Sequence, residues 1–98
     1  MNHPAASKPM LFPLGKLVAT PNALKALEKN GVTPMRLISR HMQGDWGDIP
    51  RDDAKANTDA LRISARLLSS YPLEDGARIW IITEADRSAT TLLLPSEY

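Results

Sequence analysis

Residues 44–48 bring two glycines, two aspartates and a tryptophan together in one short stretch. The carboxylates of Asp45 and Asp48 could act as a general base or bind a metal ion through oxygen, and Trp46 could stack on a partner. The same residues could instead be structural. Glycine permits left-handed backbone, Asp48 can cap a following helix, and a buried indole can fill a core. The exposure of Trp46 would distinguish a binding site from a scaffold.

His41 lies four residues before Asp45. On an unbroken helix these two side chains would share one face, so a metal-dependent enzyme built on His41, Asp45 and Asp48 is one hypothesis. Gly44 is expected to end the helix between them, and a zinc site usually includes a second histidine or a cysteine. The chain contains no cysteine. We therefore predict neither a metal site nor a cofactor.

A second polar cluster spans residues 83–88, where Glu84, Asp86 and Arg87 lie close together. Glu84 as a general base and Arg87 as an anion clamp would suit a small hydrolase or nuclease. His41 is the remaining catalytic candidate. The alternative is a hairpin turn in which Asp86 accepts backbone hydrogen bonds and Arg87 pairs with an acid. We favour the turn, because charged residues are common at the tips of hairpins.

Missing motifs, the net charge and the lack of long apolar runs argue against several functional classes. The chain has no Gly-x-Ser-x-Gly motif, no phosphate-binding loop and no dinucleotide fingerprint. The formal charge is +1 with both signs interspersed, so nucleic-acid binding is not favoured and a protein partner is preferred. No apolar run approaches the roughly 20 residues of a membrane span, and prolines interrupt any secretory signal. Together with the absence of cysteine, these features predict a cytoplasmic location.

The C-terminal third of the chain predicts a β-hairpin. Residues 77–95 contain two runs rich in β-branched, aromatic and leucine residues around a short polar centre. In the first run, Ile79 and Ile81 point to one side and Trp80 and Ile82 to the other. Apolar residues on both sides indicate a central strand that is covered on each face.

Three helices are expected upstream of this hairpin. Thr20-Pro21 and Thr33-Pro34 each combine a hydroxyl cap with a proline at the first helical position. Gly31 and Gly44 are expected to end these two helices. A third helix, with Pro50 in its first turn and Asp48 nearby as a cap, is expected to reach about residue 64.

The remaining segments complete the predicted fold. Residues 1–13 are rich in proline and predict a loosely held tail that includes His3. Residues 17–19 predict a short edge strand, which could pair with a second copy to give a homodimer. Residues 67–71 could be helix or strand, and we favour a strand. We therefore expect a single α+β domain over residues 14–98, in which a short N-terminal strand and three helices are packed on a C-terminal three-stranded antiparallel meander.

Four motifs together resemble a family of small bacterial proteins described as plasmid-related or hypothetical. They lie at residues 18–21, 44–48, 79–88 and 92–95, and the similarity extends along nearly the whole chain after the proline-rich tail. The resemblance implies carriage by mobile genetic elements and transfers no catalytic residue. A second likeness, to the RelE/ParE toxin fold, covers the order of helices and sheet and the final hairpin, although those toxins are usually more basic.

Our leading functional hypothesis is a small, non-catalytic protein-interaction module of a mobile genetic element that binds a host or defence component. Its predicted binding residues are Trp46, Asp45 and Asp48. The alternative hypothesis is a RelE/ParE-like toxin or small nuclease that acts on RNA. Its candidate residues are Arg62, Arg66, Glu84 and Arg87.

Overall fold

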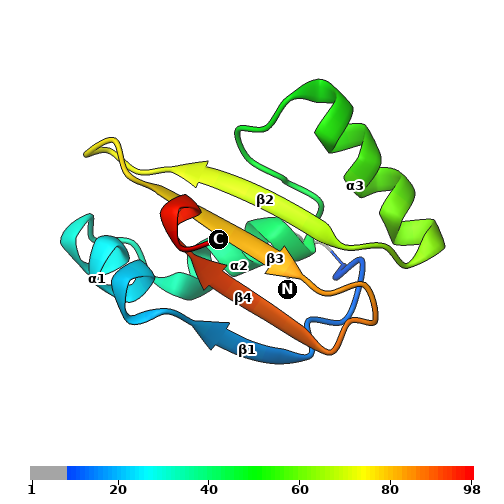
Figure 1. Ribbon diagram of the computed structural model, residues 1–98, viewed down its shortest axis with the longest axis horizontal. Coiled ribbons are helices and arrows are strands. Elements are labelled where there is room, and N and C mark those ends of the chain that lie inside the picture. The colour runs from blue at the N-terminus through cyan, green and yellow to red at the C-terminus, as the bar shows by residue number, and fades with distance from the viewer. Residues whose placement is uncertain (1–8) are drawn as a thin grey trace, which may run out of the picture.

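A computed structural model describes residues 9–98 as an α+β domain with three helices and a four-stranded sheet (Figure 1). The elements follow in the order β1 (Lys16–Ala19), α1 (Pro21–Lys29), α2 (Pro34–Met42), α3 (Arg51–Ile63), β2 (Leu67–Pro72), β3 (Arg78–Thr83), β4 (Ala89–Leu93) and the 3₁₀ helix η1 (Pro95–Glu97). The three predicted helices and the strand at 67–71 are confirmed. Among the described residues, no helix combines the length and apolar character needed to cross a bilayer.

The sheet is mixed, with strand order β1-β4-β3-β2. Strands β2, β3 and β4 form the predicted antiparallel meander, but β1 joins the same sheet and runs parallel to β4, with Lys16 opposite Ala89. The predicted meander is thus present, but the prediction did not include the N-terminal strand as a fourth, parallel member of the same sheet. The local sequence of β1 carries no information about which strand it pairs with, because its partner lies beyond all three helices.

Helices α1 and α2 cover one face of the sheet, here called the helix face. Thr20 caps α1 by accepting a hydrogen bond from the Ala23 N–H at 3.0 Å. Leu27 of α1 and Ile38 of α2 then pack in one cluster with residues of the three C-terminal strands. The strand residues in this cluster are Tyr71, Ile79, Ile81 and Leu92. The alternation of these positions along the strands is what places them on one face.

Helix α3 lies along the outer edge of β2 rather than on a face of the sheet, as Figure 1 shows. The buried Asn57 carboxamide donates to the Leu68 carbonyl at 2.7 Å and accepts from the Leu68 N–H at 3.1 Å. This double contact replaces the neighbouring strand that the edge of β2 lacks. The three helices were predicted to pack on the meander, and α3 differs from this prediction by packing against the edge of the meander. Pro50, and not Asp48, occupies the N-cap position of α3, and no side chain caps it.

The segment before α3 hydrogen-bonds the next part of the β2 edge, at Ser70. The Ser70 N–H donates to the Trp46 carbonyl at 3.0 Å, and the Asp48 N–H donates to the Ser70 carbonyl at 2.7 Å. Gly47 lies between them with φ +78°, and a Cβ built on it would stand 2.2 Å from the Ser70 oxygen. Only glycine fits this close approach in a left-handed conformation.

The packed structure begins before Leu14. Phe12, which falls in the stretch predicted as a tail, is 5% exposed and stacks on Trp46 with ring centroids 6.3 Å apart. The neighbouring Leu11 N–H donates to the Met42 carbonyl at 2.9 Å. His3 and the rest of residues 1–8 lie outside the described residues.

Candidate functional site

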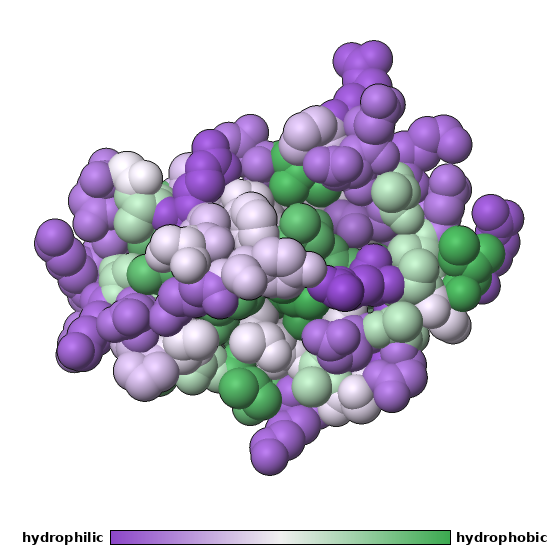
Figure 2. Space-filling model, in the orientation of Figure 1, coloured by the Kyte–Doolittle hydropathy of each residue, from purple (hydrophilic) through white to green (hydrophobic). Residues whose placement is uncertain are grey.

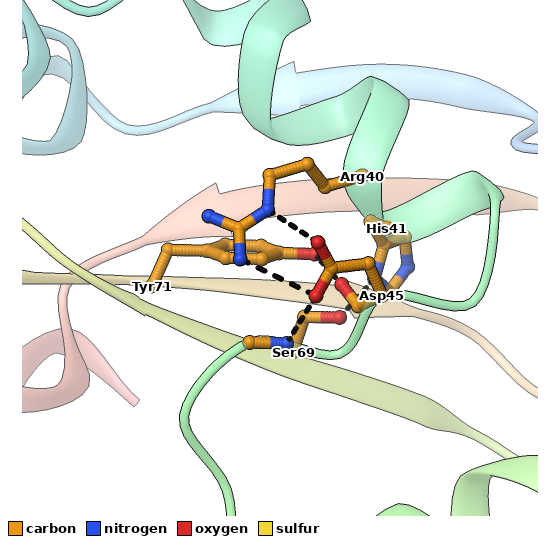
Figure 3. Close-up of polar contacts among 6 residues, drawn as sticks. Arg40, His41, Asp45, Ser69 and Tyr71 are labelled. Atoms are coloured by element: carbon orange, nitrogen blue, oxygen red, sulfur yellow. Dashed lines mark hydrogen bonds and ion pairs between the residues drawn. The ribbon is translucent and has the colours of Figure 1, made fainter.

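His41 lies on α2 with its side chain buried between the helix and the sheet (Figure 3). Its Nδ1 is 2.6 Å from the Ser69 hydroxyl on β2, and its Nε2 is 2.9 Å from the Thr83 hydroxyl on β3. The Thr83 hydroxyl is in turn 2.7 Å from that of Thr90 on β4, which donates to the Leu14 carbonyl at 2.7 Å. A line of hydrogen bonds therefore crosses the three antiparallel strands under α2.

The direction of every proton in this line follows from its last member. The Leu14 carbonyl can only accept, so Thr90 donates to it and must accept from Thr83. Thr83 then has no proton left for His41, which must donate from Nε2. In a neutral imidazole the other nitrogen, Nδ1, accepts, and Ser69 donates to it. The line thus fixes one tautomer of His41.

Burial, together with the smaller effect of the nearby charge of Arg87, lowers the pKa of His41 to about 4. The imidazole is therefore neutral at neutral pH, as the line of hydrogen bonds requires. Ser69 and His41 have the contact of a nucleophile and its base, a pair that the sequence analysis did not predict. Both side chains are 0% exposed, however, so no substrate can reach them in this structure. The sequence signal for this line is the presence of Ser69, Thr83 and Thr90 at inward-facing strand positions.

Asp45 and Arg40 form a second polar unit above Tyr71, and Figure 3 shows the guanidinium lying over the phenol ring. Arg40 Nε donates to Asp45 Oδ2 at 2.7 Å, and the Tyr71 hydroxyl donates to the Asp45 carbonyl at 2.6 Å. Burial raises the pKa of Tyr71, so the phenol keeps its proton as a donor. Asp45 also accepts from the Gly47 N–H at 3.2 Å. These contacts hold the loop between α2 and α3 against the sheet.

The three residues predicted to bind a partner occupy different environments. Trp46 is 7% exposed and packs with Phe12 and Leu67 in the second core cluster. Its indole therefore fills the core, as the structural interpretation of this segment expects. Asp45 and Asp48 remain exposed, and Asp48 Oδ2 accepts from Arg78 Nη2 at 2.7 Å. Each of the two carboxylates is thus paired with an arginine of its own.

The tip of the β3–β4 hairpin does not assemble the predicted catalytic pair. The guanidinium of Arg87 donates to the carbonyls of Ala60 and Ala65 at 3.0 and 2.7 Å, at the C-terminal end of α3. A cation in this position is stabilised by the helix dipole and by the unpaired last carbonyls. Arg87 therefore binds backbone oxygens rather than an acid, while the Glu84 side chain is exposed. Asp86 accepts from the Ser88 N–H at 2.9 Å, as expected for a turn.

The catalytic candidates His41, Glu84 and Arg87 do not converge on an exposed cleft. His41 and Arg87 both contact Phe12: the two ring centroids are 5.2 Å apart for His41, and the Arg87 Cζ atom is 5.7 Å from the Phe12 centroid. His41 is fully buried, however, and Arg87 is hydrogen-bonded to the end of α3. Within residues 9–98, no three histidine, aspartate or glutamate side chains are grouped so that they could hold a metal ion.

An aromatic pair is found instead on the opposite side of the sheet, here called the η1 face. Trp80 of β3 is partly exposed and meets Tyr98 edge to face, with centroids 5.6 Å apart. Tyr98 is 69% exposed, and Arg66 donates to its hydroxyl. Beside Trp80 lies a hollow of about 250 Å³ whose lining includes Leu68 and Arg78. Figure 2 shows this side of the molecule, with hydrophobic residues recessed near its centre among pale and polar ones.

This aromatic pair was not identified from the sequence, which assigned the binding role to the other tryptophan. Comparison of the chain with protein-family models, with curated proteins and with solved structures finds no match.

Proposed function

We propose that this protein is a small, non-catalytic protein-interaction module whose partner contacts the η1 face around Trp80 and Tyr98. The exposed aromatic pair is the observation that carries the proposal. Tryptophan, tyrosine and arginine are the residue types enriched where protein interfaces gain most of their binding energy. On this face all three types lie together, with Arg66 against Tyr98 and Arg78 beside the hollow next to Trp80.

Three of the side chains that could do chemistry support this choice, because each of them has a structural contact. His41 is neutral and sealed, Arg87 binds the end of α3, and Asp45 is paired with Arg40. A catalytic group must reach its substrate, and a buried histidine bonded at both ring nitrogens cannot do so. The hollow beside Trp80 offers a partner side chain a place to enter, whereas the sealed line of hydroxyls under α2 offers none.

The biological setting of the proposal comes from the resemblance to plasmid-related bacterial proteins. In that setting the chain acts in the cytoplasm on behalf of a mobile genetic element, and its partner is a host or defence component. Asp48 remains a candidate binding residue of this surface, because its carboxylate is exposed and it lines the hollow beside Trp80. Asp45 is also an exposed candidate, but it lies with Arg40 and Tyr71 towards the helix face. Trp46 contributes by supporting the segment that carries them.

Site-specific photo-crosslinking in bacteria tests the proposed surface. A benzoyl-phenylalanine replacing Tyr98 should yield a defined protein adduct, because that side chain is 69% exposed beside Trp80. The matched control places the same group at Ile63, which is 65% exposed at the end of α3. Loss of the adduct when Trp80→Ala is added would link it to the aromatic pair. Equal adducts from both positions, or none from either, would contradict the proposal.

Overexpression separates the module from the alternative, an RNA-directed toxin or nuclease. The proposal expects normal growth at high expression. Growth arrest that is relieved by Glu84→Ala, with a folded variant confirmed by circular dichroism, would instead favour the toxin. Glu84 suits this test because its exposed side chain can be changed with little effect on folding. Arg87→Ala is less informative, because it also removes the contacts with Ala60 and Ala65.

A further inference from the structure

Strand β1 leaves its outer side open. On its inner side β1 is bonded to β4 and the residue before it: the Lys16 N–H donates to the Ser88 carbonyl and the Thr20 N–H donates to the Leu92 carbonyl, at 3.0 Å each. In a parallel pair, alternate residues bond to the same neighbour, so the N–H and C=O groups of Leu17 and Ala19 point away from β4. In Figure 1 no helix or strand of the described residues lies beyond β1 on this side.

The side chains along this edge are apolar and exposed. Leu17 is 47% exposed and Val18 is 40% exposed, although both lie in the middle of a strand. An exposed apolar edge with free backbone groups is a template for another strand. Lys16 is the only charged residue in β1, and it lies at the end of the strand rather than at its centre.

We propose that β1 pairs with β1 of a second copy of this chain, antiparallel and with Val18 on the twofold axis. Leu17 of each copy then faces Ala19 of the other, and these two pairs exchange all four outward N–H···O bonds. Val18 faces Val18 across the axis in a pair without direct hydrogen bonds, where side chains approach most closely. The result is one continuous sheet with four strands from each copy.

The residues that flank β1 exclude the neighbouring registers. A twofold axis at Ala19 would place Leu17 opposite Pro21, which has no N–H to donate. An axis at Leu17 would place Ala19 opposite Gly15, which has φ +66° and lies so close to the Arg87 carbonyl that a Cβ would be 2.4 Å away. Only the axis at Val18 gives every outward backbone group of β1 a partner.

Charge complementarity favours a second copy over an unrelated strand. In this register Lys16 lies opposite Thr20 of the other copy, and the Thr20 hydroxyl donates to the Glu97 carboxylate at 2.7 Å. Glu97 also accepts from Asn22 and from the Leu94 N–H, and these contacts lower its pKa and keep it ionised. Among the described residues, neither Lys16 nor Glu97 belongs to an ion pair. The twofold axis would bring each lysine to the glutamate of the other copy.

The dimer goes beyond the proposed function and is independent of it. A twofold axis perpendicular to the sheet places both η1 faces on the same side, so that a dimer would present two aromatic pairs to a partner. A monomer that still gives the Tyr98 adduct would refute the dimer alone. A dimer without that adduct would refute the proposed partner surface alone.

Cysteine crosslinking tests the register directly, because the chain has no cysteine of its own. Two Val18→Cys chains would have Cα atoms about 4.5 Å apart, within the range of a disulfide. Mild oxidation should therefore give a covalent dimer more than about tenfold faster than for Leu17→Cys, whose two copies lie out of register. Ile63→Cys, at a position on α3 that is more exposed than Val18 (65% against 40%), controls for random collision.

A charge exchange tests the pairing in solution without any crosslink. Sedimentation of the unmodified protein should show twice the mass of one chain, with a dissociation constant that Lys16→Glu raises about fivefold or more. Adding Glu97→Lys to Lys16→Glu should restore much of the affinity. A protein that stays monomeric at millimolar concentration would overturn the proposal. So would crosslinking of Val18→Cys no faster than that of Ile63→Cys.

Discussion

The two edge strands of this sheet, β2 and β1, differ in whether their outward backbone groups are hydrogen-bonded within the chain. At the β2 edge, the outward N–H and C=O groups of Leu68 are hydrogen-bonded to the Asn57 carboxamide. Those of Ser70 are hydrogen-bonded to the backbone on either side of Gly47. At the β1 edge, the outward groups of Leu17 and Ala19 meet no other part of the described chain. One edge is completed by the chain itself, and the other has outward backbone groups without a partner among the described residues.

This difference shows where the fold uses its polar side chains. Burying a side-chain amide costs free energy unless both its N–H and its C=O group are hydrogen-bonded. Asn57 bonds both groups to the backbone of one residue, Leu68. The open edge carries no such device and exposes apolar side chains instead. We infer that the β2 edge contributes to folding of the monomer and that the β1 edge contributes to association.

Gly47→Ala should have the largest effect, because it breaks the sealed edge. The new methyl group would clash with the Ser70 carbonyl and the Tyr71 ring while the backbone stays at φ +78°. We expect the free energy of unfolding to fall by roughly 3 kcal/mol or more in urea titrations. Gly76→Ala is the control, since its φ is +94° but no atom lies within 4 Å, and only the backbone strain of about 1 kcal/mol applies. Equal losses for both variants would show that close packing at Gly47 is unimportant.

Asn57→Ala should have the next largest effect. It leaves the Leu68 N–H and C=O without partners in a partly buried position. The expected loss of unfolding free energy is about 2 to 3 kcal/mol. Thr58→Ala, on the next residue but exposed, should cost far less. Hydrogen exchange should show faster exchange at the Leu68 amide in Asn57→Ala, and protection unchanged from the unmodified protein would refute the sealing role.

Low pH should decrease the free energy of unfolding through His41, which lies in the interior under α2. The pKa of His41 is about 4 in the folded protein and about 6.5 when unfolded, so the unfolded state binds more protons between these values. Stability is therefore complete above pH 6.5 and falls as the pH decreases towards 4, by about 2 kcal/mol at pH 5. His41→Gln should be less stable at pH 7 but should lose this pH dependence. An equal slope in both proteins would assign the acid sensitivity to other groups.

The smallest effect is expected at the open edge. Val18→Thr should change the free energy of unfolding by less than about 0.5 kcal/mol when measured at concentrations that keep the protein monomeric. Its side chain is 40% exposed, whereas Ile81→Val, at a fully buried position of β3, should cost about 1 kcal/mol. A large loss at Val18 in the monomer would mean that the β1 edge also contributes to folding.

Local sequence signals predicted the helices and the hairpin well. The Thr-Pro starts, with Gly31 after the first helix and Gly44 after the second, fix α1 and α2 to within a few residues because caps and glycines act on neighbouring backbone. The strand at residues 67–71 was also predicted correctly. These features depend on residues that are close together in the chain.

Features that depend on distant residues were not predicted. Trp46, a predicted binding residue, packs in the core against Phe12, which is distant in the sequence. Trp80, predicted on a strand covered on both faces, is partly exposed beside Tyr98. The pairing of His41 with Ser69, Thr83 and Thr90 likewise needs the sheet register. Periodicity shows that a residue faces inward but does not show which residue it meets.

The parallel pairing of Lys16 with Ala89 also has a consequence for biosynthesis. During synthesis β1 must wait for β4 before it can join the sheet of its own chain, since β4 is the last strand of this sheet to be made. Until translation reaches that point, the nascent chain exposes both sides of an apolar ribbon. Chaperone binding during synthesis should therefore be strongest in the interval between emergence of residues 16–19 and emergence of residues 89–93.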